Sequence, residues 1–318
     1  MLKEFSNDYI GMDSSIKETR FPDMKLVQTT DCFYPLIEDP YLMGKITCAN
    51  VLSDLYAMGV ASCDNMLMIL GISEKLEENI KDTVTKLIIT GFHDAAADAG
   101  TIVTGGQTIR NPWFLLGGVA STVVREIEII RPVNAVAGDV LVLTKPLGTR
   151  PAVNAHVALY DEQKRNKLMQ TLTEQEVIDC YNQAVSSMIR LNKIGAELMH
   201  KYDAHASTDV TGFGILGHAN QLAKNTKEKV KFNIHLLPVF KHSLTIDNIF
   251  DYGLTSGRSA ETSGGLLICM SAKNANMFID EISELENHKA FVVGNVVKCT
   301  NDEDRCAEMA QSLKIIEI

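Results

Sequence analysis

Short apolar runs alternate with longer amphipathic stretches along the chain, a pattern that predicts strands interleaved with helices. In the first half, runs too short for a helix predict strands over residues 25–30, 64–71, 101–104 and 113–124. Apolar positions at helical spacing predict helices over residues 39–59 and 73–99. This mixture of elements indicates an α/β or α+β architecture.

The second half of the chain continues the alternation. It predicts strands over residues 139–144, 204–209, 288–297 and 315–318, and a polar glycine turn that leads into a buried strand over residues 261–268. It also predicts two helices before residue 203, the longer over residues 173–202. A glycine-rich turn at Thr211 opens a further helix. Pro, Asn and Gly interrupt the pattern over residues 132–138, so we expect a boundary there between domain 1–135 and domain 136–318.

The stretch over residues 25–60 combines a strand, a carboxylate and a helix. The strand runs directly into Asp31, so a carboxylate lies where the strand ends. Asp39 and Pro40 predict the helix start, because the Asp side chain accepts from an orphan N–H and Pro has no N–H to leave unpaired. Gly59 predicts a left-handed cap at the other end of the helix.

Asn50 and Asp54 are four residues apart and share a face of this helix, within an otherwise apolar run. An Asp on a helix usually lies on a solvated stripe, but here the stripe would be one or two residues wide. Burying an unpaired carboxylate is costly, so Asp54 needs a cation opposite it or must be neutral. Together with Asp31 at a strand end, this favours a shared metal ion.

Two pairs of glycines interrupt the predicted strands. Gly105 and Gly106 follow the strand over residues 101–104, and paired glycines after a strand allow close backbone approach to an anion such as phosphate. Such a pair more often marks an ordinary turn. Gly117 and Gly118 lie inside a strand-like run, where they indicate a bulge or close backbone packing.

Composition and charge narrow the function classes. The 318 residues suggest about two domains, and 46% hydrophobic with 22% charged residues is typical of a globular protein. The net charge of −10 argues against a general nucleic-acid binder, which needs a basic face for phosphates. An acidic enzyme with a phosphorylated ligand would rely on metal ions for positive charge.

The seven cysteines show no CxxC or Cys/His metal spacing, and an odd number in a long chain does not indicate a disulfide framework. We therefore expect a reducing, cytoplasmic compartment. No apolar run approaches the ~20 residues of a membrane helix, and the N-terminus lacks a signal-peptide pattern. We expect a soluble protein that does not bind a membrane.

Several motifs, in order along nearly the whole chain, resemble those of the selenophosphate synthetase family of the aminoimidazole-ribonucleotide-synthetase-like superfamily. They are IGMD (10–13), LVQTTD (26–31), DPYLMGKITCANVLSDLYAMG (39–59), TGGQT (104–108), LTKPLGT (143–149), STDVTGFGILGHA (207–219) and TSGGLLI (262–268). The resemblance implies an N-terminal ATP-binding domain, a C-terminal α/β domain and a homodimer joined through the N-terminal sheets. The implied reaction converts ATP, water and selenide into selenophosphate, AMP and phosphate, for selenocysteine biosynthesis.

The resemblance also implies roles for individual residues. Asp13, Asp54 and Asp209 would bind Mg²⁺ ions that bridge the ATP phosphates, and Asp31 would act in the same acidic cluster, through the metal or directly on the nucleotide. Further nucleotide contacts, from the partner subunit, would come from Gly105, Gly106, Gln107 and Thr108. This agrees with the preference of Mg²⁺ for oxygen ligands, since carboxylates facing a triphosphate would otherwise repel it.

One departure concerns catalysis. Competent family members carry a glycine-rich segment with a Cys or selenocysteine and a Lys upstream of the IGMD motif, and here ten residues precede Gly11. We expect this chain to lack that segment, to hold no catalytic residue of its own, and to be inactive or impaired as given. Cys32, beside Asp31, is expected not to replace the nucleophile, and His218 is expected to be a capping or core residue. The apolar surroundings of Cys48, Cys63 and Cys269 predict buried packing residues.

Three functions remain open at this stage. The first is a selenophosphate synthetase that carries the nucleotide and metal machinery. The second is a regulatory paralogue that binds nucleotide or partner proteins without making selenophosphate. The third is another phosphoryl-transfer enzyme of the superfamily, acting on aminoimidazole ribonucleotide or thiamine phosphate, against which the LSDLYAMG and TGFGILGHA sequences count.

Overall fold

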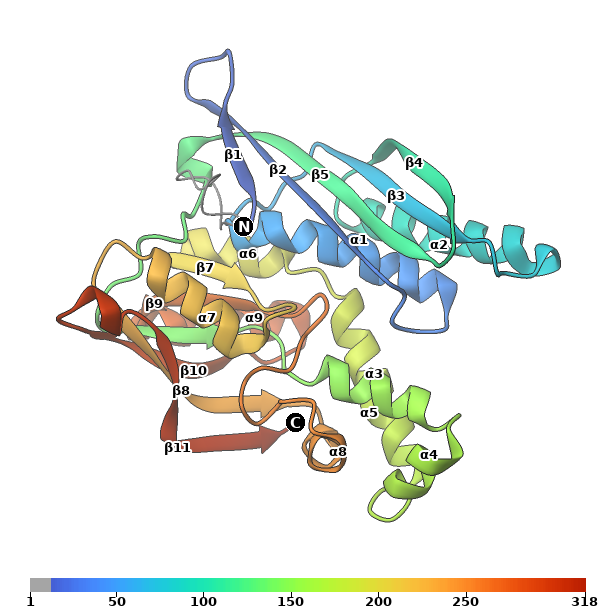
Figure 1. Ribbon diagram of the computed structural model, residues 1–318. Helices are drawn as coiled ribbons and strands as arrows, with labels where there is room; N and C mark the ends of the chain where they lie inside the picture. The colour runs from blue at the N-terminus through green and yellow to red at the C-terminus, as the bar shows by residue number, and fades with distance from the viewer. Residues whose placement is uncertain (1–12) are drawn as a thin grey trace. The chain divides into compact units, whose positions relative to one another are not determined.

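A computed structural model describes residues 13–318, apart from the side chain of Glu303, and divides them into two compact units (Figure 1). The first unit comprises residues 13–130 and 191–197, and the second comprises residues 131–190 and 198–318. Each unit contains a mixed sheet with helices, which confirms the expected α/β or α+β class. The domain boundary expected between residues 135 and 136 stays a prediction.

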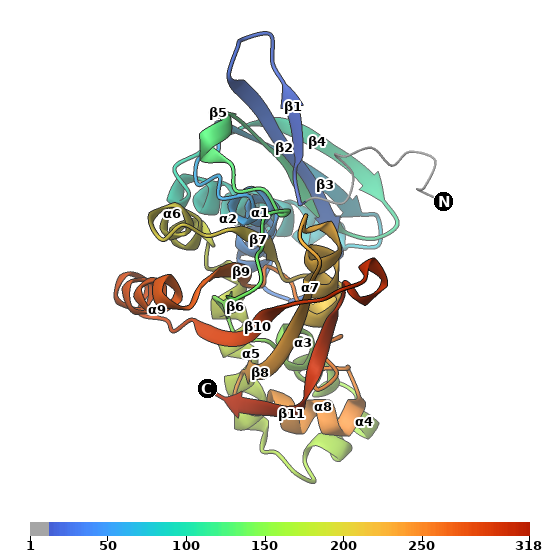
Figure 2. The same ribbon diagram turned by 90° about the vertical axis from the view of Figure 1, so that its left-hand side faces the viewer.

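Within the described residues of the first unit, five strands form one sheet in the order β1-β2-β5-β3-β4. The strands are β1 (Ser15–Glu18), β2 (Met24–Phe33), β3 (Asn65–Ser73), β4 (Val103–Asn111) and β5 (Leu115–Arg125). Neighbours pair antiparallel, except β3 and β4, which are parallel because α2 (Glu78–Asp98) connects them. Figure 2 shows α2 and α1 (Pro40–Ala57) on the same side of this sheet.

The ends of α1 follow the predicted local chemistry. The Asp39 side chain accepts a hydrogen bond of 2.9 Å from the N–H of Leu42, and Pro40 is the first helical residue. At the other end Gly59 has a φ of 72°, its N–H donates to the Tyr56 carbonyl, and the N–H of Val60 donates to the Leu55 carbonyl. These two bonds satisfy carbonyls that the helix leaves open and complete the predicted left-handed cap.

Glycines let α1 and α2 approach each other at backbone distance. A Cβ on Gly44 would lie 2.1 Å from the carbonyl oxygen of Ile88, and a Cβ on Gly91 would lie 1.9 Å from that of Tyr41. Each glycine therefore faces the backbone of the other helix. Because α1 also packs on β2 and β5 and is buried along most of its length, this crossing helps to fix its position against the sheet.

The structure corrects two boundaries in this unit. Gly105 and Gly106 do not form a turn after a strand: β4 runs through them to Asn111, because parallel pairing with β3 continues along the whole segment. The helix predicted to begin at Ser73 begins at Glu78, since β3 extends through Ser73. At Gly117 the register with β2 is regular, and a Cβ would lie 2.2 Å from the Asp31 carbonyl oxygen, so close backbone packing is correct and a bulge is wrong.

The described residues of the second unit form a six-stranded sheet in the order β11-β8-β10-β6-β9-β7. Its strands are β6 (Asp139–Leu143), β7 (Ala206–Asp209), β8 (Val230–Val239), β9 (Leu266–Ser271), β10 (Phe291–Lys298) and β11 (Ala307–Glu317). The helices that follow residue 130 are α3 (Thr149–Ala158), α4 (Glu162–Leu168), α5 (Glu174–Ile189), α6 (Lys193–Lys201), α7 (Gly214–Asn225), α8 (Ser243–Phe250) and α9 (Ala272–Glu286). One apolar core lies between the sheet and α7, and another lies among α3, α4, α5 and α8.

The single long helix predicted over residues 173–202 is wrong, because α5 ends at Ile189 and α6 begins at Lys193. Arg190 leaves the helix with a ψ of 128°, and its carbonyl oxygen accepts a 2.6 Å hydrogen bond from Nζ of Lys145. A tertiary partner thus replaces the helical hydrogen bond.

Among the described residues, none of the helices combines the length and the apolar character needed to cross a bilayer.

We expect Gly91→Ala to destabilise the protein strongly. Overpacking typically costs about 1–3 kcal/mol, and here the methyl group meets backbone that cannot rotate away, which outweighs the ~1 kcal/mol that Ala gains in helix propensity. Denaturant unfolding measures the effect, with Gly105→Ala as control, because a Cβ there makes an ordinary 3.7 Å contact with Leu67. Equal stabilities of the two variants would contradict the proposed close crossing.

Candidate functional site

In the first unit, carboxylates gather where β2 faces α1. Alternation along β2 puts Thr29 and Asp31 on its inner face, and helical spacing puts Asn50 and Asp54 on one face of α1. The amide of Asn50 donates to Asp31, and the hydroxyl of Thr29 donates to Asp54. The structure therefore brings together the two carboxylates that the sequence singled out, each held by a donor from the facing element.

Asp31 is held from two sides. One carboxylate oxygen accepts the Asn50 amide, and the other accepts the Cys32 backbone N–H at 2.8 Å. Burial raises the pKa of Asp31, while both hydrogen bonds act in the opposite direction by stabilising the anion. A nearby cation would offset this cost of burial and keep the carboxylate ionised.

Asp13 lies beside Asp54 in the same unit, with carboxylate oxygens within 4.8 Å of each other. Two carboxylates at this separation repel each other, and a divalent cation between them would reverse the sign of the interaction. Both offer only oxygen ligands, the type that Mg²⁺ prefers. The donor set in the first unit therefore fits Mg²⁺.

In the second unit, Asp209 ends β7 and is 2% exposed. The turn that follows it is fastened by His218 of α7, whose Nε2 accepts the backbone N–H groups of Thr211 at 3.1 Å and Phe213 at 3.3 Å. Accepting at Nε2 requires a neutral ring, and burial lowers the pKa of His218 to about 4. The expectation that His218 is a core residue is confirmed.

Lys145 fastens two further segments of this unit. Its buried Nζ donates to the carbonyl oxygens of Arg190 at 2.6 Å and Ser263 at 2.8 Å. Burial lowers the pKa of Lys145 well below its usual value. Gly264 and Gly265, which follow Ser263, pack directly against backbone atoms. A Cβ on Gly265 would lie 2.4 Å from the backbone nitrogen of Lys145, and a Cβ on Gly264 would lie 2.0 Å from the carbonyl oxygen of Val210.

Glu261 completes this arrangement from the start of the same loop. Its buried carboxylate accepts the backbone N–H groups of Gly148 at 2.8 Å and Thr149 at 2.9 Å, at the N-terminus of α3. Burial raises the pKa of Glu261 to about 7, against the lowering effect of these hydrogen bonds. Sequence reasoning missed the roles of Lys145 and Glu261. The sequence did contain a signal for both: Lys145 lies within the motif LTKPLGT, and Glu261 directly precedes the motif TSGGLLI.

The four residues expected to contact nucleotide lie elsewhere in the first unit. Gly105, Gly106, Gln107 and Thr108 are exposed on β4, which β3 and β5 separate from β2. At about 4.8 Å between strands, this puts β4 about 14 Å from the strand of Asp31. Within one chain, these residues and the carboxylates of β2 and α1 are therefore not brought together.

The cysteines occupy two kinds of position. Cys48, Cys63 and Cys269 are buried among packing residues, as predicted. Cys32 is exposed on β2, and alternation puts its side chain on the face opposite Asp31. This position agrees with the expectation that Cys32 is not a substitute nucleophile at the acidic cluster.

Comparison with protein families gives two matches. Residues 13–124 match the family described as "AIR synthase related protein, N-terminal domain", and residues 136–306 match "AIR synthase related protein, C-terminal domain". "Selenide, water dikinase" of Dictyostelium discoideum is 49% identical over 97% of this chain and 86% of that protein. "Selenide, water dikinase 2" of Mus musculus is 50% identical over 97% of this chain and 68% of that protein.

Solved structures with the same fold are more distant in sequence. "AaThiL complexed with AMPPCP and TMP" has a TM-score of 0.70 at 19% identity, covering 98% of this chain and 91% of that one. "Crystal Structure of Hydrogenase Maturation Protein HypE in complex with ATP" has a TM-score of 0.68 at 17% identity, covering 98% and 90%. At this level of identity they show a shared fold only.

We expect His218 to make stability depend on pH. Its folded pKa of about 4 lies below the unfolded value near 6.5, so the unfolded chain binds more protons between these values. The contribution of the neutral ring is therefore complete above pH 6.5 and declines by about 3 kcal/mol as the pH falls to 4.

Denaturant unfolding from pH 7 to pH 4 measures this loss, with His218→Gln as the comparison. The Gln side chain also offers an oxygen acceptor to the Thr211 N–H but does not titrate. The variant should lose less stability than the wild type over this range, since other groups titrate equally in both proteins. Parallel pH profiles would show that His218 is not held neutral.

Proposed function

Because this chain belongs to the selenide, water dikinase family, we propose that it makes selenophosphate from ATP, water and selenide and releases AMP and phosphate. The observation that carries the proposal is identity near 50% with these enzymes over 97% of the chain. The solved structures named as thiamine monophosphate kinases share 20% identity or less with this chain and support the fold alone. The product would supply selenocysteine biosynthesis.

Asp13, Asp31, Asp54 and Asp209 are proposed as ligands of Mg²⁺. Support comes from the oxygen-only donor set and from the separation of 4.8 Å or less between Asp13 and Asp54. When bound, Mg²⁺ would neutralise phosphate charge and draw electron density from the phosphoryl group. The chain's own part is to orient these carboxylates, through Asn50 on Asp31 and Thr29 on Asp54.

The exposed residues of β4 are proposed to contact nucleotide bound at a second subunit. Gly105, Gly106, Gln107 and Thr108 would then complete the partner's site in a homodimer, since β4 lies far from the carboxylates of its own chain. Paired glycines leave the strand backbone open to a phosphate or ribose.

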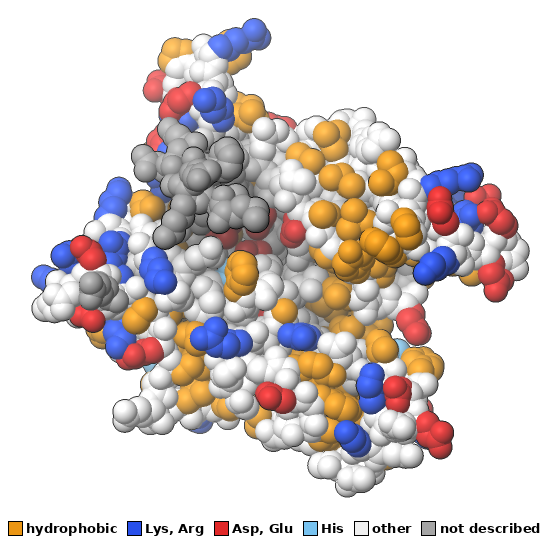
Figure 3. Space-filling view, viewed as in Figure 1, with side chains coloured by type: hydrophobic (Ala, Val, Ile, Leu, Met, Phe, Trp, Pro, Cys, Tyr) orange, Lys and Arg blue, Asp and Glu red, His pale blue; other side chains and the backbone are white. Residues whose placement is uncertain are grey.

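The outer face of the first sheet is proposed as the surface that joins the two subunits. Leu67 and Ile69 of β3 and Val119 of β5 point to the face opposite α1, and Ile109 of β4 is 46% exposed. Figure 3 shows hydrophobic side chains gathered over the region of β3, β4 and β5. A contiguous apolar surface of this kind is typical of an interface.

A cytoplasmic location is part of the same proposal. All seven cysteines are free, including the exposed Cys32 and the partly exposed Cys299 and Cys306. Thiols at the surface remain reduced in the cytoplasm and are prone to oxidation outside it.

We expect Asp54→Asn to weaken Mg²⁺-dependent ATP binding by at least tenfold, roughly the effect of losing one charged ligand. Cys32→Ser is the matched control, since it changes one side chain on the other face of β2. Calorimetric titration with and without Mg²⁺ measures both. Equal, small effects of the two substitutions would remove Asp54 from the proposed site.

The reaction itself is tested by selenide-dependent formation of AMP from ATP, using the complete product of the reading frame. We expect AMP to appear only with selenide present, and Asp54→Asn to abolish it. Nucleotide binding without selenide-dependent AMP would instead indicate a regulatory protein. Phosphorylation of thiamine monophosphate would overturn the substrate assignment.

A further inference from the structure

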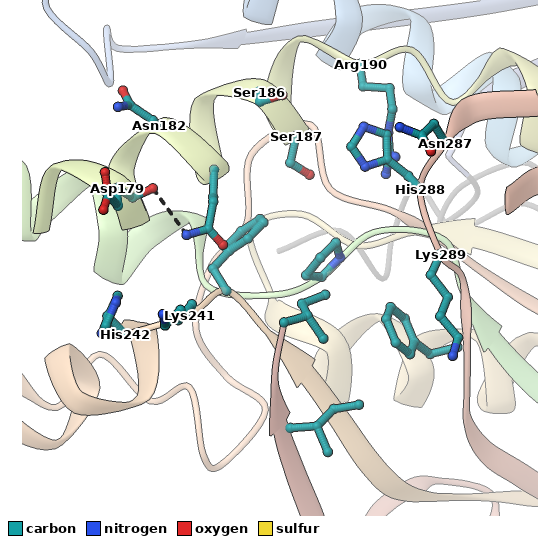
Figure 4. A pocket seen from close by; sticks show the side chains of 16 residues that line it. Asp179, Asn182, Ser186, Ser187, Arg190, Lys241, His242, Asn287, His288 and Lys289 are labelled. Carbon is teal, nitrogen blue, oxygen red and sulfur yellow. Dashed lines mark hydrogen bonds between the residues drawn. The ribbon is translucent and has the colours of Figure 1, made fainter. Parts of the chain in front are cut away.

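The second unit contains a cavity of about 960 Å³ that takes no part in the proposed reaction. Figure 4 shows its walls, which come from α5, the loop after β8, the turn between α9 and β10, and the end of β11. A cavity of this size holds a small organic molecule. None of the residues proposed for the metal ion or nucleotide lines it.

Basic side chains stand on opposite sides of this cavity. Arg190, His288 and Lys289 lie on one side in Figure 4, and Lys241 and His242 lie on the other. The lining contains one acidic residue, Asp179, which accepts a hydrogen bond of 2.8 Å from Gln175. In a chain with a net charge of −10, this local excess of positive charge favours an anionic ligand.

Arg190 brings a fixed positive charge with unused donors. Its side chain is 15% exposed, and Nη2 donates to the Thr144 carbonyl at 3.2 Å. Nη1 lies 3.6 Å from a Glu286 oxygen, and within the described part of the chain Nε and Nη1 have no hydrogen-bond acceptor. Buried donors without acceptors are costly, so an anion reached by a small movement of this side chain would be stabilised.

The remaining lining includes an apolar part. Pro146, Phe240, Phe291, Ile316 and Ile318 contribute this apolar lining. A lining that is charged in one part and apolar in another selects a ligand with both kinds of group.

Two residues that line the cavity have a left-handed backbone. His242 has a φ of 71° and precedes α8, and Asn287 has a φ of 55° and follows α9. This conformation is uncommon for residues other than Gly, and such residues concentrate where a site demands a particular geometry. Both turns carry basic residues to the cavity, Lys241 before one and His288 after the other.

We propose that this cavity binds an organic phosphate. The phosphate lies at Arg190, His288 and Lys289, and the organic group lies against the apolar part of the lining. Lys289 serves both parts, because its Nζ is 5.9 Å from the centroid of the Phe291 ring. This site is separate from the proposed nucleotide site and goes beyond the proposed function.

Fluorescence anisotropy of 4-methylumbelliferyl phosphate with the full chain tests the proposal. We expect saturable binding that weakens at least tenfold in Lys289→Glu, roughly the value of one charge-assisted hydrogen bond. Lys273→Glu, at an exposed position of α9 outside the cavity, is the matched control and should bind like the wild type. Asp54→Asn should also leave this binding unchanged, which separates it from the proposed nucleotide site.

Competition identifies the group that is recognised. Displacement of the probe by AMP but not by ribose 5-phosphate indicates that the natural ligand is a nucleotide, and displacement by both indicates a broader class of phosphate esters. Neutral 4-methylumbelliferyl glucoside should not bind. The proposal is overturned if inorganic phosphate competes as well as AMP, if Lys289→Glu and Lys273→Glu bind alike, or if Asp54→Asn abolishes binding.

Discussion

Carboxylates set into apolar surroundings are the constraint on which the first unit depends. The unit meets it by reciprocal hydrogen bonds: the helix supplies Asn50 to the strand's Asp31, and the strand supplies Thr29 to the helix's Asp54. Two residues of strand span about 6.6–7 Å, and four residues of helix span about 6 Å, so the two pairs match in length. The pairing requires β2 and α1 to run in opposite directions along this edge.

A buried lysine plays a comparable part in the second unit. Nζ of Lys145 donates to the backbone carbonyl groups of Arg190 and Ser263 and so holds the ends of two segments. Removing such a donor leaves buried carbonyl groups unsatisfied. Both units therefore use buried polar groups to fix loops and element ends, while their apolar cores provide most of the stabilisation.

The sequence predicts what local chemistry decides. The start of α1 at Asp39 and its end at Gly59 follow from hydrogen-bond rules within a few residues, and both are confirmed. The break after α5 could not be predicted, because the Arg190 carbonyl leaves the helix for a partner 45 residues away in sequence. For the same reason a glycine pair in β4 indicated a turn, although pairing with β3 keeps it extended.

Some residues of the candidate site could likewise be predicted from the sequence, and others could not. Asp31 and Asp54 could be selected from their context, but the donors Thr29 and Asn50 depend on how a strand lies against a helix, which spacing alone does not give. Lys145 and Glu261 were missed because charged side chains are normally exposed, and their burial depends on backbone partners far away in the chain.

The glycine crossing of α1 and α2 separates the position of the site from the details of side-chain packing. Where the two backbones touch, the distance between the helices is set by van der Waals contact between backbone atoms, and changes in neighbouring Leu, Met or Ile side chains do not alter it. The apolar core around α1 could then vary or be redesigned while Asn50 and Asp54 keep their places. Gly44 and Gly91 have no such freedom, although neither lies among the residues proposed to do chemistry.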